Sequence, residues 1–372
     1  MLTCNYPSIG FRFQVVPVLS GAVYGDFDLY YLFIRMKKPT TIKDIAEKLQ
    51  VSIATVSRAL RGSTEIKKET KNAVLEMARQ MDYHPNLIAS SLSSKKSKII
   101  GVVVPTINRY FWSNSIAGIE NLAYQEGYKV MIFQSGESFK KEVEIVETLA
   151  NSKVDGIIIA FSKETWTFDH VQHVIDRDVP VVLYERACAN LGTSKIKTDD
   201  SNGAFILTNH LIARGRKNIG YIGGPLALGV CQDRLEGYQM ALDAAGIPIK
   251  QHLIISLEDF TFDLAGKALQ QLWDSADRPD GLICFADILA IGAMHAAHQL
   301  GIRVPGQLSI AGFGNDETSR FISPPITTMA QPSFEMGEMA ARVLLEEIAC
   351  SGEAHEKKHE VIKSRLIVRE ST

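Results

Sequence analysis

Cysteine is scarce and scattered in this chain of 372 residues. The five thiols form no CxxC pair and lie far apart in the sequence: Cys4, Cys188, Cys231, Cys284 and Cys350. This spacing argues against a disulfide framework and against a zinc site. It is the pattern expected of a protein that works in a reducing cytoplasm.

Long apolar runs and catalytic motifs are missing as well. No run reaches the roughly 18 apolar residues that a membrane-spanning helix needs. No GxGxxG motif, Walker lysine or nucleophile elbow is present. One HExxH string, at residues 355–359, lies in the polar stretch CSGEAHEKKHE, and no third ligand follows it. The sequence therefore predicts no enzyme, no catalytic residue, no metal and no cofactor.

Residues 1–35 differ in amino-acid composition from the remainder of the chain. They are rich in aromatic and apolar side chains, are broken by proline and glycine, and lack the basic start of a signal peptide. We interpret them as an over-extended translation start, with Met36 as the first native residue. A genuine but poorly ordered extension is the alternative, and neither interpretation assigns the segment a function.

Charge is divided unevenly along the chain. The whole sequence carries a net charge of −2, but residues 36–98 hold thirteen Lys/Arg against six Asp/Glu, a net of +7. The other residues therefore carry a net charge of −9. A basic head on an acidic body indicates that the head meets a polyanion, although an ordinary solvated basic face would give the same count.

Two short amphipathic helices are predicted within Thr41–Leu60, TIKDIAEKLQVSIATVSRAL. Apolar residues of the first helix recur at i, i+3, i+4 and i+7: Ile42, Ile45, Ala46 and Leu49. Thr41 and Asp44 form a capping-box signature, and Ser52 offers an N-cap to the second helix. The second helix would present small or polar side chains that suit a DNA major groove. A plain two-helix hairpin is the alternative.

The residues that follow complete a small head and a connector. Lys67–Met81 has the periodicity of a third helix. In DYHPNLIASSL, Pro85 suits a first helical turn, and the helix after it is too short to be stable alone. We expect that helix to fold only against a surface. A polar, basic connector over residues 93–98 follows.

From Ile99 onward, apolar runs alternate with amphipathic helical stretches. The runs are Ile99–Val104, Val130–Phe133, Val154–Ala160, Val179–Tyr184, Ile219–Ile222, Leu282–Phe285 and Leu308–Phe313. Such β-branched runs between helices predict parallel sheets covered on both faces. There are too many for one ordinary sheet, so we predict two α/β lobes that face each other across a ligand cleft.

In this order of parts the chain resembles the LacI/GalR family of bacterial transcription regulators over Met36–Arg369. The segments that carry the resemblance are the two-helix motif above, DYHPNLIASSL, KIIGVVVP, NSKVDGIII, VPVVLYER, RKNIGYIGGP, DRLEGYQMAL, ADILAIGAM and PPITTMAQPSFEMGEMAARVLLEEI. This resemblance implies an all-α helix-turn-helix head and a two-lobed α/β core like that of the type I periplasmic binding proteins. The implied boundaries are 36–82 for the head, 83–98 for the hinge and 99–372 for the effector-binding and dimerisation core.

The resemblance also implies which residues meet DNA. They are Thr41, Ser52, Ile53, Ala54, Thr55, Ser57, Arg58, Thr70, Tyr83, Asn86, Ala89 and Leu92. Ile53 and Ala54 would read bases by apolar contact, and Arg58 could fork onto guanine. Thr55, Ser57 and Thr70 would hold phosphates. Asn86 would lie in the minor groove, where Leu92 would wedge between base pairs, although a leucine buried at a domain junction is the alternative.

For the effector cleft, the resemblance implies six residues: Tyr110, Phe111, Arg186, Arg234, Phe260 and Asp287. Tyr110 and Phe111 would cover a ligand ring, Arg234 would open a helix, and Asp287 would cap the ADILA helix. This set suits a polyhydroxylated or anionic small molecule. The chain departs from relatives at Gly314, where many have an acidic residue, and at Leu228, where purine-binding members have arginine. Both departures argue against a purine and, to a lesser degree, against a simple hexose.

Two functions from different classes follow. The first is a cytoplasmic transcription regulator, expected to be a repressor, that binds a palindromic operator as a homodimer, with a tetramer left open. A sugar-like effector would change the lobe arrangement and thereby the spacing of the hinges. The alternative is a small-molecule binding protein whose head does not bind DNA. Operator binding that weakens steeply with salt would distinguish the two.

Overall fold

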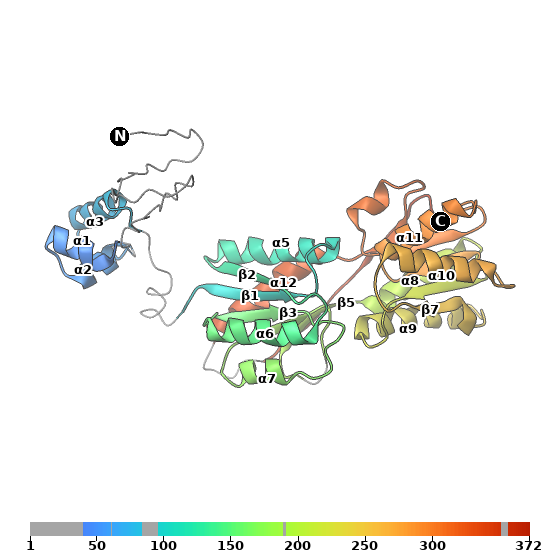
Figure 1. Ribbon diagram of the computed structural model, residues 1–372, viewed down its shortest axis with the longest axis horizontal. Helices are drawn as coiled ribbons and strands as arrows, with labels where there is room; N and C mark the ends of the chain where they lie inside the picture. Colours follow the sequence, from blue (N-terminus) through green and yellow to red (C-terminus); the bar gives the residue numbers. More distant parts are fainter. Residues whose placement is uncertain (1–39, 61, 84–95, 189–190, 351–355) are drawn as a thin grey trace, which may run out of the picture. The chain divides into compact units, whose positions relative to one another are not determined.

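The computed structural model describes residues 40–60, 62–83, 96–188, 191–350 and 356–372. It divides into two compact units, Met1–Asn86 and Leu87–Thr372 (Figure 1). We call the first unit the head and the second the core. Several sequence predictions lie outside the described residues: the 1–35 extension, the hinge residues Asn86, Ala89 and Leu92, and the first histidine of the HExxH string.

The head consists of the short helices α1 (Ile42–Leu49), α2 (Ile53–Leu60) and α3 (Lys68–Gln80). Their buried residues form one small apolar cluster: Ile45, Ala46, Val56, Ala59, Val74 and Ala78. The predicted capping box is present, because the Thr41 side chain accepts from the Asp44 backbone N–H and the Asp44 carboxylate accepts from the Thr41 backbone. The predicted three-helix head is therefore confirmed.

The described part of the core contains two six-stranded sheets. The N-lobe sheet has the order β11-β5-β4-β3-β1-β2 and the C-lobe sheet the order β12-β10-β9-β8-β6-β7. The N-lobe strands are β1 (Ile99–Val104), β2 (Lys129–Gln134), β3 (Gly156–Ile159), β4 (Val181–Tyr184), β5 (Ser194–Thr198) and β11 (His359–Ile362). The C-lobe strands are β6 (Ile219–Gly223), β7 (Ile254–Ser256), β8 (Gly281–Cys284), β9 (Ser309–Phe313), β10 (Thr327–Ala330) and β12 (Arg365–Ile367).

Helices cover both faces of each sheet, as expected of parallel strands that are buried throughout. The N-lobe helices are α5 (Tyr110–Gln125), α6 (Phe139–Asn151), α7 (Asp169–Ile175) and α12 (Ser333–Ala349). The C-lobe helices are α8 (Asp200–Ala213), α9 (Gly229–Ala244), α10 (Phe262–Asp274) and α11 (Asp287–Gln299). Successive β1 side chains show the alternation: Val102 faces the cluster under α5 and α12, whereas Val103 faces the cluster under α6 and α7.

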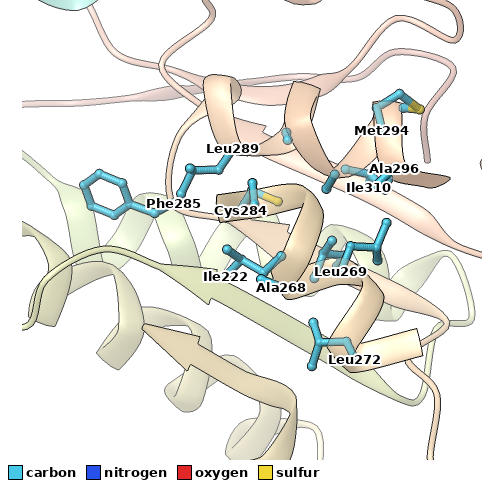
Figure 2. Close-up of a cluster of buried hydrophobic side chains, with 14 of the residues drawn as sticks. Ile222, Ala268, Leu269, Leu272, Cys284, Phe285, Leu289, Met294, Ala296 and Ile310 are labelled. Atoms are coloured by element: carbon cyan, nitrogen blue, oxygen red, sulfur yellow. The ribbon is translucent and has the colours of Figure 1, made fainter. Parts of the chain in front are cut away.

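The apolar interior of the C-lobe extends to its cleft edge. Figure 2 shows Ile222 and Cys284 of the sheet beside Ala268 of α10 and Leu289 of α11. Phe285, one residue beyond β8, lies at the edge of this cluster. The parallel strands thus end where a ligand cleft is expected in an open α/β sheet.

The described chain crosses between the lobes at three places: from β5 to α8, from β10 to α12, and from β11 to β12. The predicted two-lobed architecture is confirmed. Five of the strands, β5, β7, β10, β11 and β12, do not coincide with any of the predicted apolar runs. Most of these strands are short or alternate polar with apolar residues, so they form no continuous apolar run.

Candidate DNA-binding surface and effector cavity

The turn between α1 and α2 is fixed by backbone geometry. Gln50 adopts the left-handed conformation, with φ 51° and ψ 41°, and the Val51 N–H donates to the Ala46 carbonyl at 3.1 Å. The Ser52 hydroxyl then accepts from the Thr55 N–H at 3.0 Å, which is the N-cap predicted for the second helix. The two helices therefore form a helix-turn-helix with a defined start for α2.

One face of α2, together with the residue before it, is open to solvent. Ser52, Ala54 and Arg58 are exposed, and Ile53 is 47% exposed although it is apolar. Thr55 and Ser57 are half-buried on the same helix, while Val56 and Ala59 face the head's interior. An exposed isoleucine at a helix start beside two hydroxyls and an arginine is a surface that a DNA major groove could receive.

The other predicted DNA-contact residues are placed less directly. Thr41 is exposed at the start of α1, and Thr70 is half-buried in α3. Tyr83 packs against the head's apolar cluster, and this burial raises the pKa of its phenol. Arg58 makes a 3.6 Å ion pair with Glu65, and both side chains are largely exposed. Such a pair is weak and would release Arg58 to a phosphate or base.

A cavity of about 310 Å³ lies between the two lobes of the core. All six predicted effector residues line it: Tyr110, Phe111, Arg186, Arg234, Phe260 and Asp287. They come from both lobes, because Tyr110 and Phe111 begin α5 whereas Arg234 belongs to α9. The structure thus brings together side chains up to 177 positions apart in the chain. Their part in effector binding remains a prediction.

Arg234 lines the cavity and is only 3% exposed, and we call the part of the lining around it the floor. Its Nε donates to Asp200 at 2.8 Å, its Nη1 to the Phe285 carbonyl at 2.6 Å, and its Nη2 lies 3.5 Å from Glu185. The guanidinium also lies over the Phe313 ring, 3.7 Å from the ring centre. Since α9 begins at Gly229, Arg234 lies within the helix and does not open it as the sequence analysis expected.

Glu185 joins the two lobes at this floor. Its carboxylate accepts from the Gln331 side-chain amide at 3.1 Å, and Glu185 and Gln331 each lie beside a strand end near a crossover. Burial, reinforced by the nearby Asp200 carboxylate, raises the pKa of Glu185 to about 7 even though Arg234 opposes the shift. Burial also raises the pKa of Asp200. One guanidinium thus faces two buried carboxylates.

Asp287 is buried on the C-lobe side of the cavity. It was expected to cap its helix, but Ala286 is the N-cap and Asp287 is the first residue of α11. The carboxylate accepts from the Thr328 hydroxyl at 2.6 Å and from the Asp316 N–H at 2.7 Å instead. It therefore ties α11 to the strand ends of the sheet, and burial raises its pKa to about 6.

The mouth of the cavity is bridged by contacts between the lobes. The Arg109 guanidinium donates to the Phe260 carbonyl at 2.5 Å. The Lys163 ammonium contacts the Glu258 carbonyl at 3.2 Å and the Asp259 carboxylate at 3.3 Å. Arg109 and Lys163 belong to the N-lobe, whereas residues 258–260 form a C-lobe loop. These contacts hold the loop that carries Phe260 against the cavity.

Several residues of the cavity were not predicted from the sequence. They include Arg109, Trp112, Glu137, Glu185, Phe285 and Gln331. The sequence context of Glu185 would have allowed this residue to be predicted. Glu185 follows the apolar run VVLY and precedes Arg186, so it lies at the carboxyl end of a buried strand. Gln331 carries no such signal, because β10 has no long apolar run.

The departures from relatives can also be placed. Gly314 lines the cavity with φ +121°, and a Cβ there would touch nothing within 4 Å. Leu228 is buried in the C-lobe cluster, at the N-cap of α9. Neither residue gives the cavity a charge.

A helix-turn-helix in the same chain as a two-lobed ligand core defines the class of ligand-responsive, DNA-binding transcription regulators. Comparisons with known proteins agree. Residues 41–86 match the bacterial regulatory proteins of the lacI family, and residues 208–372 match the periplasmic binding protein-like domain. The chain belongs to the LacI family of bacterial regulators.

Three relatives illustrate the likeness. The HTH-type transcriptional repressor CytR of Escherichia coli is 34% identical over 338 residues, which cover 91% of this chain and 98% of that protein. The ribose operon repressor of Haemophilus influenzae is 32% identical over 89% of this chain and 98% of its own length. The solved complex of the transcriptional regulator CelR with cellobiose superposes with a TM-score of 0.68 at 27% identity, covering 90% of this chain and all of that one.

No helix among the described residues is long and apolar enough to cross a membrane.

Proposed function

We propose that this protein is a cytoplasmic transcriptional repressor that binds a palindromic operator as a homodimer and responds to a sugar or sugar derivative. One observation carries the proposal: an exposed α2 surface suited to a major groove occurs in the same chain as a cavity walled by two lobes. One such head can read only a half-site, so a palindrome requires two chains. The protein is not an enzyme in this proposal.

The sugar-like effector is supported by the cavity and by the relatives. Aromatic rings of Phe111, Trp112 and Phe260 and the carboxylates of Glu185 and Asp287 line the same space. Rings can stack on the apolar face of a sugar, and carboxylates accept hydrogen bonds from hydroxyls. Relatives are named for the ribose operon and for a cellobiose complex, both of which involve sugars.

Effector binding would act through the lobes. A ligand held between Glu185 of the N-lobe and Asp287 of the C-lobe stabilises one lobe arrangement over others, and the crossovers act as the hinge. In this proposal the lobe arrangement sets the spacing of the two heads of a dimer, so a change in that arrangement changes operator affinity.

Operator selection on the full-length protein tests the proposal. From a random-sequence library, we expect enrichment of a palindrome, with binding that falls steeply as salt rises. Arg58→Ala should lower affinity for the selected operator by about 5- to 100-fold, the cost of losing one good base contact. Lys43→Ala removes an exposed charge that pairs with Glu47 on α1 and serves as the matched control.

Two outcomes would contradict the proposal. If no palindromic fragment is preferred over random DNA, with or without sugars, the protein is a small-molecule binding protein whose head has another role. If Arg58→Ala and Lys43→Ala weaken binding equally, α2 does not read the operator.

A further inference from the structure

The effector cavity has an excess of negative charge. Its lining contains three guanidiniums and five carboxylates, a formal net charge of −2: Arg109, Arg186 and Arg234 against Glu137, Glu185, Asp259, Asp287 and Asp316. Lys163 and Asp200, which contact members of this set, add one charge of each sign and leave the balance unchanged. A cavity of this sign repels an anion before any contact is made.

The positive groups are already engaged within the protein. Arg186 pairs with Glu137 at 2.7 Å and also donates to the Phe161 carbonyl. Arg109 donates to the Phe260 carbonyl across the cavity mouth. An anionic ligand would have to share each guanidinium with the protein group that it already contacts, and drawing Arg186 away from Glu137 would leave a largely buried carboxylate without its cationic partner.

Arg234 is committed even more fully. Its Nε, Nη1 and Nη2 all face protein oxygens, and Phe285 and Phe313 lie over the guanidinium at 4.3 and 3.7 Å. It neutralises only one of the two carboxylates beside it, Glu185 and Asp200. Above about pH 7, where Glu185 is ionised, the floor therefore keeps one uncompensated negative charge.

Asp287 is a second uncompensated carboxylate. In the part of the chain that the structure describes, its partners are the Thr328 hydroxyl, the Asp316 N–H and the Ser319 hydroxyl, all uncharged. Burial accordingly raises the pKa of Asp287 to about 6 and that of Glu185 to about 7. Both carboxylates would be stabilised by a ligand that donates hydrogen bonds or carries positive charge.

We propose that the effector is a polyol without negative charge, whose hydroxyl or amino groups donate to Asp287 and Glu185, and that the cavity rejects phosphosugars and sugar acids. This inference rests on the proposed function, since it describes the ligand of the same regulator. The aromatic rings bind the apolar body of the polyol, and the two carboxylates select the charge of its substituents. The arginines shape the cavity and hold its walls, and they do not act as an anion receptor.

Matched ligand sets test this selectivity in the full-length protein. Each set shares one body: ribose with ribose 5-phosphate; glucose with glucosamine, gluconate and glucose 6-phosphate; cytidine with its 5′-monophosphate. Binding is measured by calorimetry and by the shift in thermal midpoint. We expect at least one uncharged or aminated member to bind, and its anionic counterpart to bind at least tenfold more weakly.

Charge-removing variants test the assignment to individual carboxylates. Glu185→Gln and Asp287→Asn should each shrink the ratio between uncharged and anionic affinities by threefold or more. Glu120→Gln, an exposed position on α5, should leave the ratio unchanged. If Asp287→Asn fails to fold, Glu185→Gln and the wild-type comparison still decide the question.

Two results would overturn the inference: an anionic member that binds more tightly than its uncharged counterpart, or no binding by any uncharged or aminated member. Operator preference is measured on the same preparation without ligand. Loss of that preference would refute the proposed regulator while leaving the charge comparison intact, so the two failures are distinguishable.

Discussion

Glu185 is a carboxyl group whose burial is only partly compensated. Three groups contact it: the Arg234 guanidinium, the Gln331 amide and the Thr198 hydroxyl. The unperturbed pKa of 4.5 rises to about 7 in the folded protein. An acid with a raised folded-state pKa binds its proton more tightly in the folded state, so the group loses stabilising free energy as pH rises from about 4.5 to about 7.

Glu185→Gln should therefore become more stable relative to wild type as pH increases. The glutamine keeps an acceptor for Gln331 and cannot ionise, so the difference in free energy of unfolding should grow by roughly 1–3 kcal/mol between pH 5 and pH 8. Urea unfolding followed by tryptophan fluorescence measures it, because Trp112, Trp166 and Trp273 all lie in the core.

Glu120→Gln is the control, because its exposed carboxyl should give a difference that does not change with pH. A Glu185→Gln difference that is equally flat would mean that Glu185 is ionised in the folded protein near its ordinary pKa.

At the scale of elements, the close contact of α8 and α9 depends on a residue without a side chain. A Cβ at Gly237 of α9 would lie 1.9 Å from the Ser201 carbonyl oxygen of α8. That oxygen belongs to helix backbone and cannot move without shifting α8. The same device occurs in the N-lobe, where a Cβ at Gly337 of α12 would lie 2.0 Å from the Ser115 carbonyl oxygen of α5.

Gly237→Ala should destabilise the core by about 2–4 kcal/mol, because the two helices must separate to admit the methyl group. Gly229→Ala is the matched control in the same helix. A Cβ at Gly229 meets nothing within 4 Å, so this change should be neutral or should stabilise the core by up to about 1 kcal/mol. Thermal unfolding of the two variants compares them directly, and equal midpoints would show that α8 can shift at little cost.

Elements also show what the sequence could and could not predict. Strands such as β1 and β9 are continuous apolar runs, so composition alone locates them. β5, SKIKT, alternates lysine with buried residues because it lies near the sheet edge, and it pairs with β11. That partner lies more than 150 positions further along the chain, and no local pattern encodes such a pairing. For the same reason the three crossovers could not be derived from periodicity.

The cavity, too, was predicted from the sequence only in part. The resemblance to a family supplied six lining residues, and the structure places all six around one cavity. It could not supply the charge balance, which depends on Glu185, Asp200 and Gln331 meeting from separate segments. Nor could it show that Arg186 and Arg234 are engaged within the protein. The sequence left a polyhydroxylated and an anionic ligand both open, and the charge balance of the cavity favours the first in our proposal.

At the scale of the whole core, the lobes are joined on opposite sides of the cavity by different kinds of link. The crossovers are covalent and pass beside the cluster of Glu185, Arg234 and Gln331. At the mouth, the links that the described residues make are non-covalent: Arg109 and Lys163 contact the loop around Asp259. Lobe opening must therefore break the contacts at the mouth while it bends the crossovers, so the mouth contacts set part of the balance between open and closed arrangements.

Lys163→Ala should shift that balance toward open arrangements. Its pair with Asp259 is partly exposed, with relative accessibilities of 24% and 46%, so the shift should be no more than about 1 kcal/mol, or roughly fivefold in population. Distances between spin labels at Lys140 of the N-lobe and Lys267 of the C-lobe should broaden toward longer values. Bound effector should also dissociate about two- to fivefold faster, because a more open mouth lowers the barrier to release.

Lys141→Ala, an exposed change on α6, should alter neither measurement. If Lys163→Ala matches this control, the crossovers alone determine lobe closure, and the contacts at the mouth follow closure without stabilising it.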